Sequence, residues 1–160
     1  MTVFMGVLNV TPNSFSDGGR FKEHGGADDV VKVALEMLAD GAEILDIGGE
    51  STGPGSTDVT VEEELARVIP VIQRIRAAAP DAILSIDTWK SEVAEAALRA
   101  GANWVNDVTA GRGDERIFEV AAKAGAPMVL MYSKQNSPRT DREMVRYDDV
   151  MKTVKDFLRA

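Results

Sequence analysis

Small polar side chains gather in one segment near the start of this 160-residue chain. The segment is residues 9–19, Asn-Val-Thr-Pro-Asn-Ser-Phe-Ser-Asp-Gly-Gly, called the first loop below, and it follows an apolar run. Asn9 offers a neutral carbonyl oxygen, which suits a Mg²⁺ ion that keeps most of its water. Thr11 and Ser14 add hydroxyl groups, and Phe15 offers a flat apolar ring that could stack on a ligand ring. The pattern indicates a loop that closes over a small polar ligand.

Polar side chains also follow the later apolar runs, always at the carboxyl end. The second run ends with Asp46, Glu50, Ser51 and Thr52, the third with Asp87 and Thr88, the fourth with Asn106 and Asp107, and the fifth with Tyr132 and Ser133. In parallel α/β folds, ligands bind where strands end and the following loops begin. The sequence therefore predicts a ligand site at that edge. It contains one histidine, His24 in a polar segment, so no histidine-based nucleophile or metal centre can be assembled.

Several of these residues also have structural interpretations. Asp46 and Asp107 could accept hydrogen bonds from loop amides, and Thr88 suits a helix cap. Asn106 could simply fix a turn, and Met131 could belong either to the core or to the pocket.

Short apolar runs alternate with longer amphipathic stretches throughout the chain. Residues 3–9, 43–47, 82–86, 104–108 and 128–132 are predicted strands, and residues 27–40, 61–79, 91–100, 115–124 and about 145–160 are predicted helices. Gly41, Gly101 and Gly125 each end a helix and lead directly into a strand, which is typical of a left-handed glycine cap. Thr60 with Glu63 predicts a capping box. Five successive βα units in one domain, residues 1–160, and a parallel sheet are expected.

Two parallel architectures remain open from these patterns. A closed (β/α)8 barrel needs eight strands and typically about 250 residues, so this chain is three units short. A five-stranded doubly wound sheet suits the length better.

The composition narrows the function classes. Hydrophobic residues make up 44% of the chain and aromatic residues 6%, which fits helices packed on a buried parallel sheet. The net charge of -8 argues against general binding of nucleic acids or anionic membranes. The chain has no cysteine, which excludes disulfides and thiolate zinc sites. Neither a signal peptide nor an apolar run near the roughly 20 residues of a membrane helix is recognisable, so we expect a cytoplasmic protein.

The sequence resembles the dihydropteroate synthases, which belong to the pterin-binding TIM-barrel superfamily. Four blocks in matching order carry the likeness, at residues 6–19, 46–52, 85–88 and 106–108. The likeness extends to about Met131. It implies a (β/α)8 barrel of which this chain carries the five N-terminal units, and it decides against the doubly wound sheet.

The resemblance also implies a reaction of folate biosynthesis. A dihydropteroate synthase is a transferase that joins 4-aminobenzoate to a dihydropterin methyl diphosphate, which yields dihydropteroate and releases diphosphate. Asn9 would then bind a Mg²⁺ ion that sits on the diphosphate, and Thr52 would contact the diphosphate end. Asp87 and Asn106 would hydrogen-bond the pterin ring, whose polar edge requires such groups. The remaining expected substrate-binding residues are Thr11, Ser14, Phe15 and Met131.

The chain departs from the family in two respects. The family usually has arginine after Glu-Ser-Thr, where this chain has Gly53, and Arg112 and Lys134 are the candidates to replace it. The last three barrel units would bring an aspartate, a lysine and an Arg-x-His group that the 160 residues lack. We therefore expect little turnover from this chain alone, and a homodimer or a complementing C-terminal half as its partner. A non-catalytic pterin-binding protein is an alternative, and so is a methyltetrahydrofolate methyltransferase, although the first loop argues against the latter.

Overall fold

The computed structural model of this chain describes residues 2–11, 27–53, 56–134 and 146–159. Most of the first loop is outside these ranges. The predictions made for Ser14 and Phe15 therefore lie outside the described residues, as does His24.

The described residues form five strands and five helices in strict alternation. They are β1 (Met5–Asn9), α1 (Ala27–Ala39), β2 (Ile44–Gly48), α2 (Val61–Ala78), β3 (Ile83–Asp87), α3 (Ser91–Ala100), β4 (Trp104–Asp107), α4 (Arg116–Ala124), β5 (Met128–Leu130) and α5 (Val150–Arg159). The five predicted βα units are confirmed.

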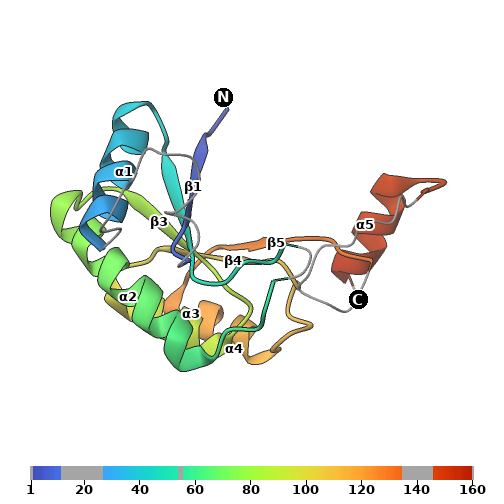
Figure 1. Ribbon diagram of the computed structural model, residues 1–160. Coiled ribbons are helices and arrows are strands. Elements are labelled where there is room, and N and C mark those ends of the chain that lie inside the picture. The colour runs from blue at the N-terminus through green and yellow to red at the C-terminus, as the bar shows by residue number, and fades with distance from the viewer. Residues whose placement is uncertain (1, 12–26, 54–55, 135–145, 160) are drawn as a thin grey trace.

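The strands form one parallel sheet in the order β1-β2-β3-β4-β5. A doubly wound sheet reverses its strand order at a switch point, and this sheet never reverses. Helices α1 to α4 lie along one side of the sheet, each packed beside the next (Figure 1). This is the arrangement of five consecutive units of a (β/α) barrel, so the doubly wound alternative is wrong.

The hydrophobic core lies between the sheet and the helix layer. Leu8, Ile47, Ile86 and Val105 are aligned across four strands and are all buried. The helices cover this row with apolar side chains, including Val30, Ala34, Val68, Ile72, Ile75, Val93, Ala97, Ile117 and Ala121. Each large aliphatic side chain buried in this way contributes about 1.5–3 kcal/mol to folding.

The opposite face of the sheet is not covered by a helix layer. Side chains alternate between the two faces of a strand, so the neighbours of the core row point to this face. Met5, Val7, Ile83 and Val129 lie there and are between 36% and 54% exposed. In a closed barrel, this face becomes the interior.

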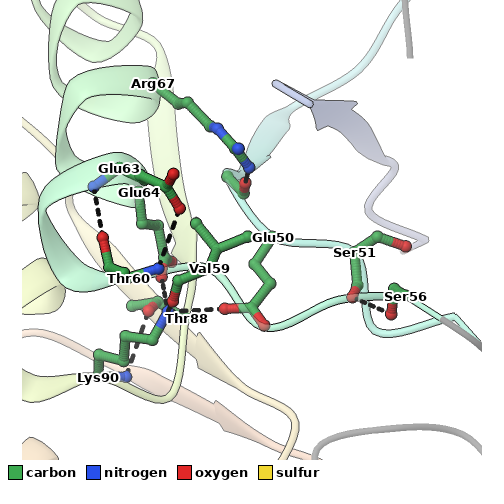
Figure 2. Close-up of polar contacts among 11 residues, drawn as sticks. Glu50, Ser51, Ser56, Val59, Thr60, Glu63, Glu64, Arg67, Thr88 and Lys90 are labelled. Carbon is green, nitrogen blue, oxygen red and sulfur yellow. Dashed lines mark hydrogen bonds and ion pairs between the residues drawn. The ribbon is translucent and has the colours of Figure 1, made fainter. Parts of the chain in front are cut away.

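The predicted helix ends are confirmed in their local geometry. Gly41, Gly101 and Gly125 have φ values of 103°, 119° and 65°, which is the left-handed conformation that glycine adopts without strain. The amide of Glu63 donates to Thr60 Oγ1 at 3.2 Å, and the amide of Thr60 donates to Glu63 Oε2 at 3.3 Å. This reciprocal pair is the predicted capping box of α2 (Figure 2).

Strand β5 ends at Leu130, two residues earlier than predicted. Its partner β4 stops at Asp107, because the Asp107 carboxylate accepts hydrogen bonds from the amides of Thr109 at 2.7 Å and Gly111 at 2.6 Å. These bonds turn the chain away from the sheet after Asp107, whose carbonyl accepts the amide of Met131 as the last hydrogen bond to β5. The structural interpretation of Asp107 is therefore the right one.

Helix α5 begins at Val150, so the prediction of a start near residue 145 is wrong for residues 146–149. Asp149 Oδ1 accepts a hydrogen bond from the amide of Lys152 at 2.9 Å, and aspartate is a favoured helix cap. The helix stands apart from α1 to α4 in Figure 1, and its Phe157 ring packs edge-on against Tyr132. Within the described ranges, no helix is both long and apolar enough to cross a bilayer.

A buried ion cluster ties together the segments that follow β2 and β3 (Figure 2). Lys90 Nζ donates to Glu50 Oε2 at 2.6 Å, to Glu64 Oε2 at 2.5 Å and to the carbonyl of Val59 at 2.7 Å. The two carboxylate side chains are only 2% and 1% exposed. We call this group the Lys90 clamp. It joins the β2–α2 loop, the first turn of α2 and the start of α3.

The charges of the Lys90 clamp stabilise one another. Burial disfavours the charged ammonium, but hydrogen bonds to Glu50 and Glu64 outweigh burial and raise the pKa of Lys90 above 10.5. A lysine at the start of α3 is opposed by the helix dipole, so the two carboxylates explain why it is tolerated there.

The β2–α2 loop also packs directly on α2 at a glycine. A Cβ atom on Gly49 would lie 2.8 Å from Val68 Cγ1 and 2.9 Å from Glu64 Cγ, too close for any other residue. The carbonyl of Gly49 accepts a hydrogen bond from Arg67 Nη1 at 2.7 Å. The loop that leads to Thr52 is thus held from both sides.

Replacing Lys90 by methionine should strongly destabilise the chain, since two buried carboxylates would lose their cation. We expect a loss of about 3–5 kcal/mol in the free energy of unfolding, measured by urea denaturation. The control is Lys32→Met, because Lys32 pairs with Glu36 at 4.0 Å on the exposed surface of α1 and should cost at most about 1 kcal/mol. Equal losses for the two variants would show that the Lys90 clamp does not hold these segments.

Candidate functional site

The carboxyl ends of the first four strands bring three predicted site residues side by side. The register aligns Asn9 with Gly48, Gly48 with Asp87, and Asp87 with Asn106. We call these four residues the strand-end row. Residues aligned in a parallel sheet point to the same face and lie about 4.8 Å apart from strand to strand. Side chains distant in sequence therefore share one edge of the uncovered face.

Gly48 is the one residue of the strand-end row without a side chain. A Cβ atom built at this position would lie 3.3 Å from Asp87 Oδ2 and 3.7 Å from Asn9 Oδ1. The two oxygen atoms thus flank the same point above the backbone of Gly48. Any side chain at position 48 would begin within 3.3 Å of the Asp87 carboxyl group, so glycine leaves the two oxygen atoms uncovered.

Asp87 is a mostly buried carboxyl group, and within the described residues no hydrogen bond or ion pair reaches its side chain. Burial raises the pKa of Asp87 from 3.8 to about 7, and three nearby carboxylates add to the shift. These carboxylates are Asp46, Glu64 and Asp107. Since the folded pKa exceeds the ordinary value, stability that is full below pH 4 is lost as the pH rises towards 7. A buried carboxyl group with a strongly raised pKa is typical of a functional site.

Asn106 is bound to a second aspartate. Its Nδ2 atom donates to Asp46 Oδ2 at 2.8 Å, and Asp46 is 3% exposed. The alternative left open for Asp46, that it accepts loop amides, is not what the structure shows. Asn106 likewise does more than fix a turn, because its side chain is held in the strand-end row.

Thr52 lies on the β2–α2 loop rather than in the strand-end row. Glu50, two residues earlier, is fixed by the Lys90 clamp. The Oγ atom of Ser56 lies 2.6 Å from the carbonyl oxygen of Ser51 (Figure 2) and 2.6 Å from that of Gly53, so its proton is shared between the two. The loop therefore presents Thr52 from a backbone that is anchored before and after it.

The other predicted contacts are placed less centrally. Thr11 follows the strand-end row by two residues and is half-buried. Met131 lies just beyond β5, is 37% exposed, and donates its amide to the carbonyl of Asp107 at 3.2 Å. Arg112 Nε donates to the carbonyl of Thr109, and its guanidinium lies 4.8 Å from the Phe157 ring, so it faces α5.

The Lys90 clamp was not recognised from the sequence. One signal for it exists, since a lysine directly before a predicted helix is unfavourable unless an acidic partner holds it. Glu64 gave no such signal, because it follows two other glutamates in an ordinary acidic first turn.

The described residues contain no group of three or more His, Cys, Asp or Glu side chains that could hold a metal ion. Mg²⁺ bound to a diphosphate needs fewer protein ligands, since phosphate oxygens and water complete its shell. The Asn9 Oδ1 atom, which no side chain of residue 48 covers, is a suitable single ligand. The amide oxygen of Asn9 thus fits a Mg²⁺ ion whose other ligands are water or the oxygen atoms of a bound anion.

The sequence matches known proteins along nearly its whole length. The profile of the family described as pterin binding enzyme matches residues 5–160. The dihydropteroate synthase of Bacillus subtilis is 44% identical over 159 residues, which are 99% of this chain and 54% of the relative. The folic acid synthesis protein fol1 of Schizosaccharomyces pombe is 46% identical over 151 residues, 94% of this chain and 20% of the relative. The chain therefore spans about half the length of the first relative and one fifth of the length of the second.

Solved structures give the same result. The Xanthomonas albilineans dihydropteroate synthase with 4-aminobenzoic acid matches with a TM-score of 0.82 and 46% identity, over 98% of this chain and 53% of that one. The Clostridium difficile dihydropteroate synthase with pteroic acid matches with a TM-score of 0.83 and 41% identity, over 99% and 56%. These matches confirm the resemblance to dihydropteroate synthases. The chain belongs to the pterin-binding enzyme family, and it forms five N-terminal units of that family's (β/α)8 barrel.

Proposed function

We propose that this chain is the pterin-binding part of a dihydropteroate synthase, a transferase of folate biosynthesis. The strand-end row carries the proposal, above all its buried Asp87 carboxyl group without a partner in the described residues. A buried acceptor of this kind suits a ligand that brings its own hydrogen-bond donors. The flat aminopyrimidinone ring of a pterin has such donors along one edge.

Each proposed contact follows from the residue type and its place. Asp87 accepts ring N–H groups, and the amide of Asn106 binds the neighbouring ring edge. Asn9 would hold a Mg²⁺ ion, and that ion would supply charge neutralisation for a departing diphosphate. The final contact is Thr52, presented to the diphosphate end by the anchored β2–α2 loop.

The second substrate in this proposal is 4-aminobenzoate. The solved relative from Xanthomonas albilineans holds 4-aminobenzoic acid, and the one from Clostridium difficile was determined with pteroic acid. Thr11, Ser14, Phe15 and Met131 are the residues that we propose for this end of the site. The first three of these residues follow Asn9 in the sequence, and Met131 follows β5.

We further propose that residues 1–160 act as one partial barrel domain whose remaining wall comes from elsewhere. The apolar side chains exposed on the uncovered face, such as Val7 and Ile83, favour a covering partner. Within the described residues, β1 and β5 also have unpaired outer edges. A complementing C-terminal half fits both needs, and a homodimer is the alternative. The cytoplasmic location stays a prediction.

Pterin binding without catalysis is the second candidate function. It is favoured by the strand-end row, whose one ionisable side chain is the carboxyl group of Asp87. Lys90 is held in the Lys90 clamp, and position 53 is glycine. The two candidates differ in turnover but share the pterin site.

Asp87→Asn should weaken pterin binding, because it removes an ionic acceptor. The expected loss is about 1.5–3 kcal/mol, or roughly 10- to 150-fold in affinity. Isothermal calorimetry with dihydropterin methyl diphosphate measures it. The matched control is Asp81→Asn, an exposed aspartate at the other end of β3, which should bind as the unchanged chain does. An unchanged affinity in Asp87→Asn would exclude Asp87 from the site.

The purified 160-residue chain should form no dihydropteroate above background from dihydropterin methyl diphosphate and 4-aminobenzoate with Mg²⁺. The protein as its gene encodes it, with any further chain or partner that completes the barrel, should form the product. Product from the 160-residue chain alone would contradict the need for a second wall. Tight pterin binding without product in the complete protein would favour the non-catalytic candidate.

A further inference from the structure

Asp46 is a buried carboxylate with an unusual pair of environments. Its Oδ2 atom accepts the hydrogen bond from Asn106, while its Oδ1 atom is buried and has no partner among the described residues. The register places Asp46 opposite Ser85. Both residues lie two positions before the strand-end row, so they are on the same face of the sheet as that row.

The stability of the fold does not explain this carboxylate. A buried polar atom without a partner is unfavourable, and an apolar residue at such a position is often as stable or more so. The flanking positions in β2, Leu45 and Ile47, are apolar and fully buried. What Asp46 does provide is its single bond to Asn106.

That bond decides which way the amide of Asn106 points. Asn106 Nδ2 donates to Asp46 Oδ2, so the NH₂ group of Asn106 is turned towards Asp46. The carbonyl oxygen and the second N–H group of the amide then remain for a ligand. Without Asp46, the amide could rotate by half a turn and exchange its acceptor and donor.

We propose that Asp46 is a positioning residue that fixes the amide of Asn106 and thereby makes the site select an amino group beside a ring nitrogen acceptor. The proposal rests on the pterin site put forward above. A 2-amino-4-oxopteridine has this edge, with its amino group next to N1. A 2,4-dioxopteridine has the reverse edge, with a carbonyl group next to an N–H group. The fixed amide complements the first edge and opposes the second.

The test compares these two ligands in the protein as its gene encodes it. Calorimetry gives the affinities for 6-hydroxymethylpterin and for its 2,4-dioxo counterpart, 6-hydroxymethyllumazine. In Asp46→Asn, residue 46 can donate as well as accept, so the amide of Asn106 is no longer fixed. We expect the preference for the pterin to fall at least tenfold. The control Ser85→Ala removes the buried hydroxyl opposite Asp46 and should leave the preference unchanged.

The outcomes separate this inference from the proposed function. Failure of the unchanged protein to bind the pterin would overturn the proposed function and this inference with it. Pterin binding with the same preference in Asp46→Asn would overturn only the inference, as would an equal loss of affinity for both ligands. Either of these results would leave Asp46 a structural residue.

A second measurement needs no variant at residue 46. Hydrogen exchange of side-chain amides, followed by NMR in the unchanged protein, should show one slowly exchanging Nδ2 proton on Asn106. The exposed side chain of Gln73 on α2 is the reference for free exchange. Exchange of both Asn106 protons at the rate of Gln73 would overturn the proposal, even if Asp46→Asn failed to fold.

Discussion

The parallel register of β1 to β4 is the constraint on which the rest of the structure depends. It aligns the apolar row that begins at Leu8 against the helices, and one residue later it aligns the strand-end row on the opposite face. A slip of one residue in any strand would exchange the two faces. The burial of Ile47, Ile86 and Val105 thus also fixes the positions of Asn9, Asp87 and Asn106.

Several carboxyl groups are buried in this fold, where a negative charge lowers stability, and they differ in their partners. Glu50 and Glu64 share the ammonium group of Lys90 in the Lys90 clamp, which anchors the loop that leads to Thr52. Asp87 has no such cation among the described residues, and its burial, together with three nearby carboxylates, raises its pKa to about 7. A fold selected only for stability would replace Asp87, because nothing in the described structure needs it. The paired carboxylates thus support the fold, whereas the unpaired Asp87 belongs to the proposed ligand site.

Local signals in the sequence were enough for the βα units but not for every boundary. The glycine caps and the capping box depend on neighbours within a few residues, so they could be predicted. The early end of β5 depends on the Asp107 side chain, which favours a turn over a longer β4. The late start of α5 depends on the Asp149 side chain, which favours a cap over a longer helix.

The roles of individual site residues needed the tertiary structure. Asp46 and Asp107 look alike in sequence, each near the end of a strand, yet one binds a side chain and the other binds loop amides. The partners lie on other segments or depend on the exact turn, which residue spacing does not encode. Lys90 was missed for the same reason, since its two carboxylate partners are 40 and 26 residues away.

The central claim is that the buried carboxyl group of Asp87 binds a ligand at the strand-end row. The pKa of Asp87 tests it most directly. It can be measured from the pH dependence of its ¹³C carboxyl signal, with and without 6-hydroxymethylpterin. Our account predicts a pKa of about 7 in the free chain and a lower one with the pterin, because donors favour the ionised form. An ordinary pKa near 3.8, unaffected by the pterin, would contradict it.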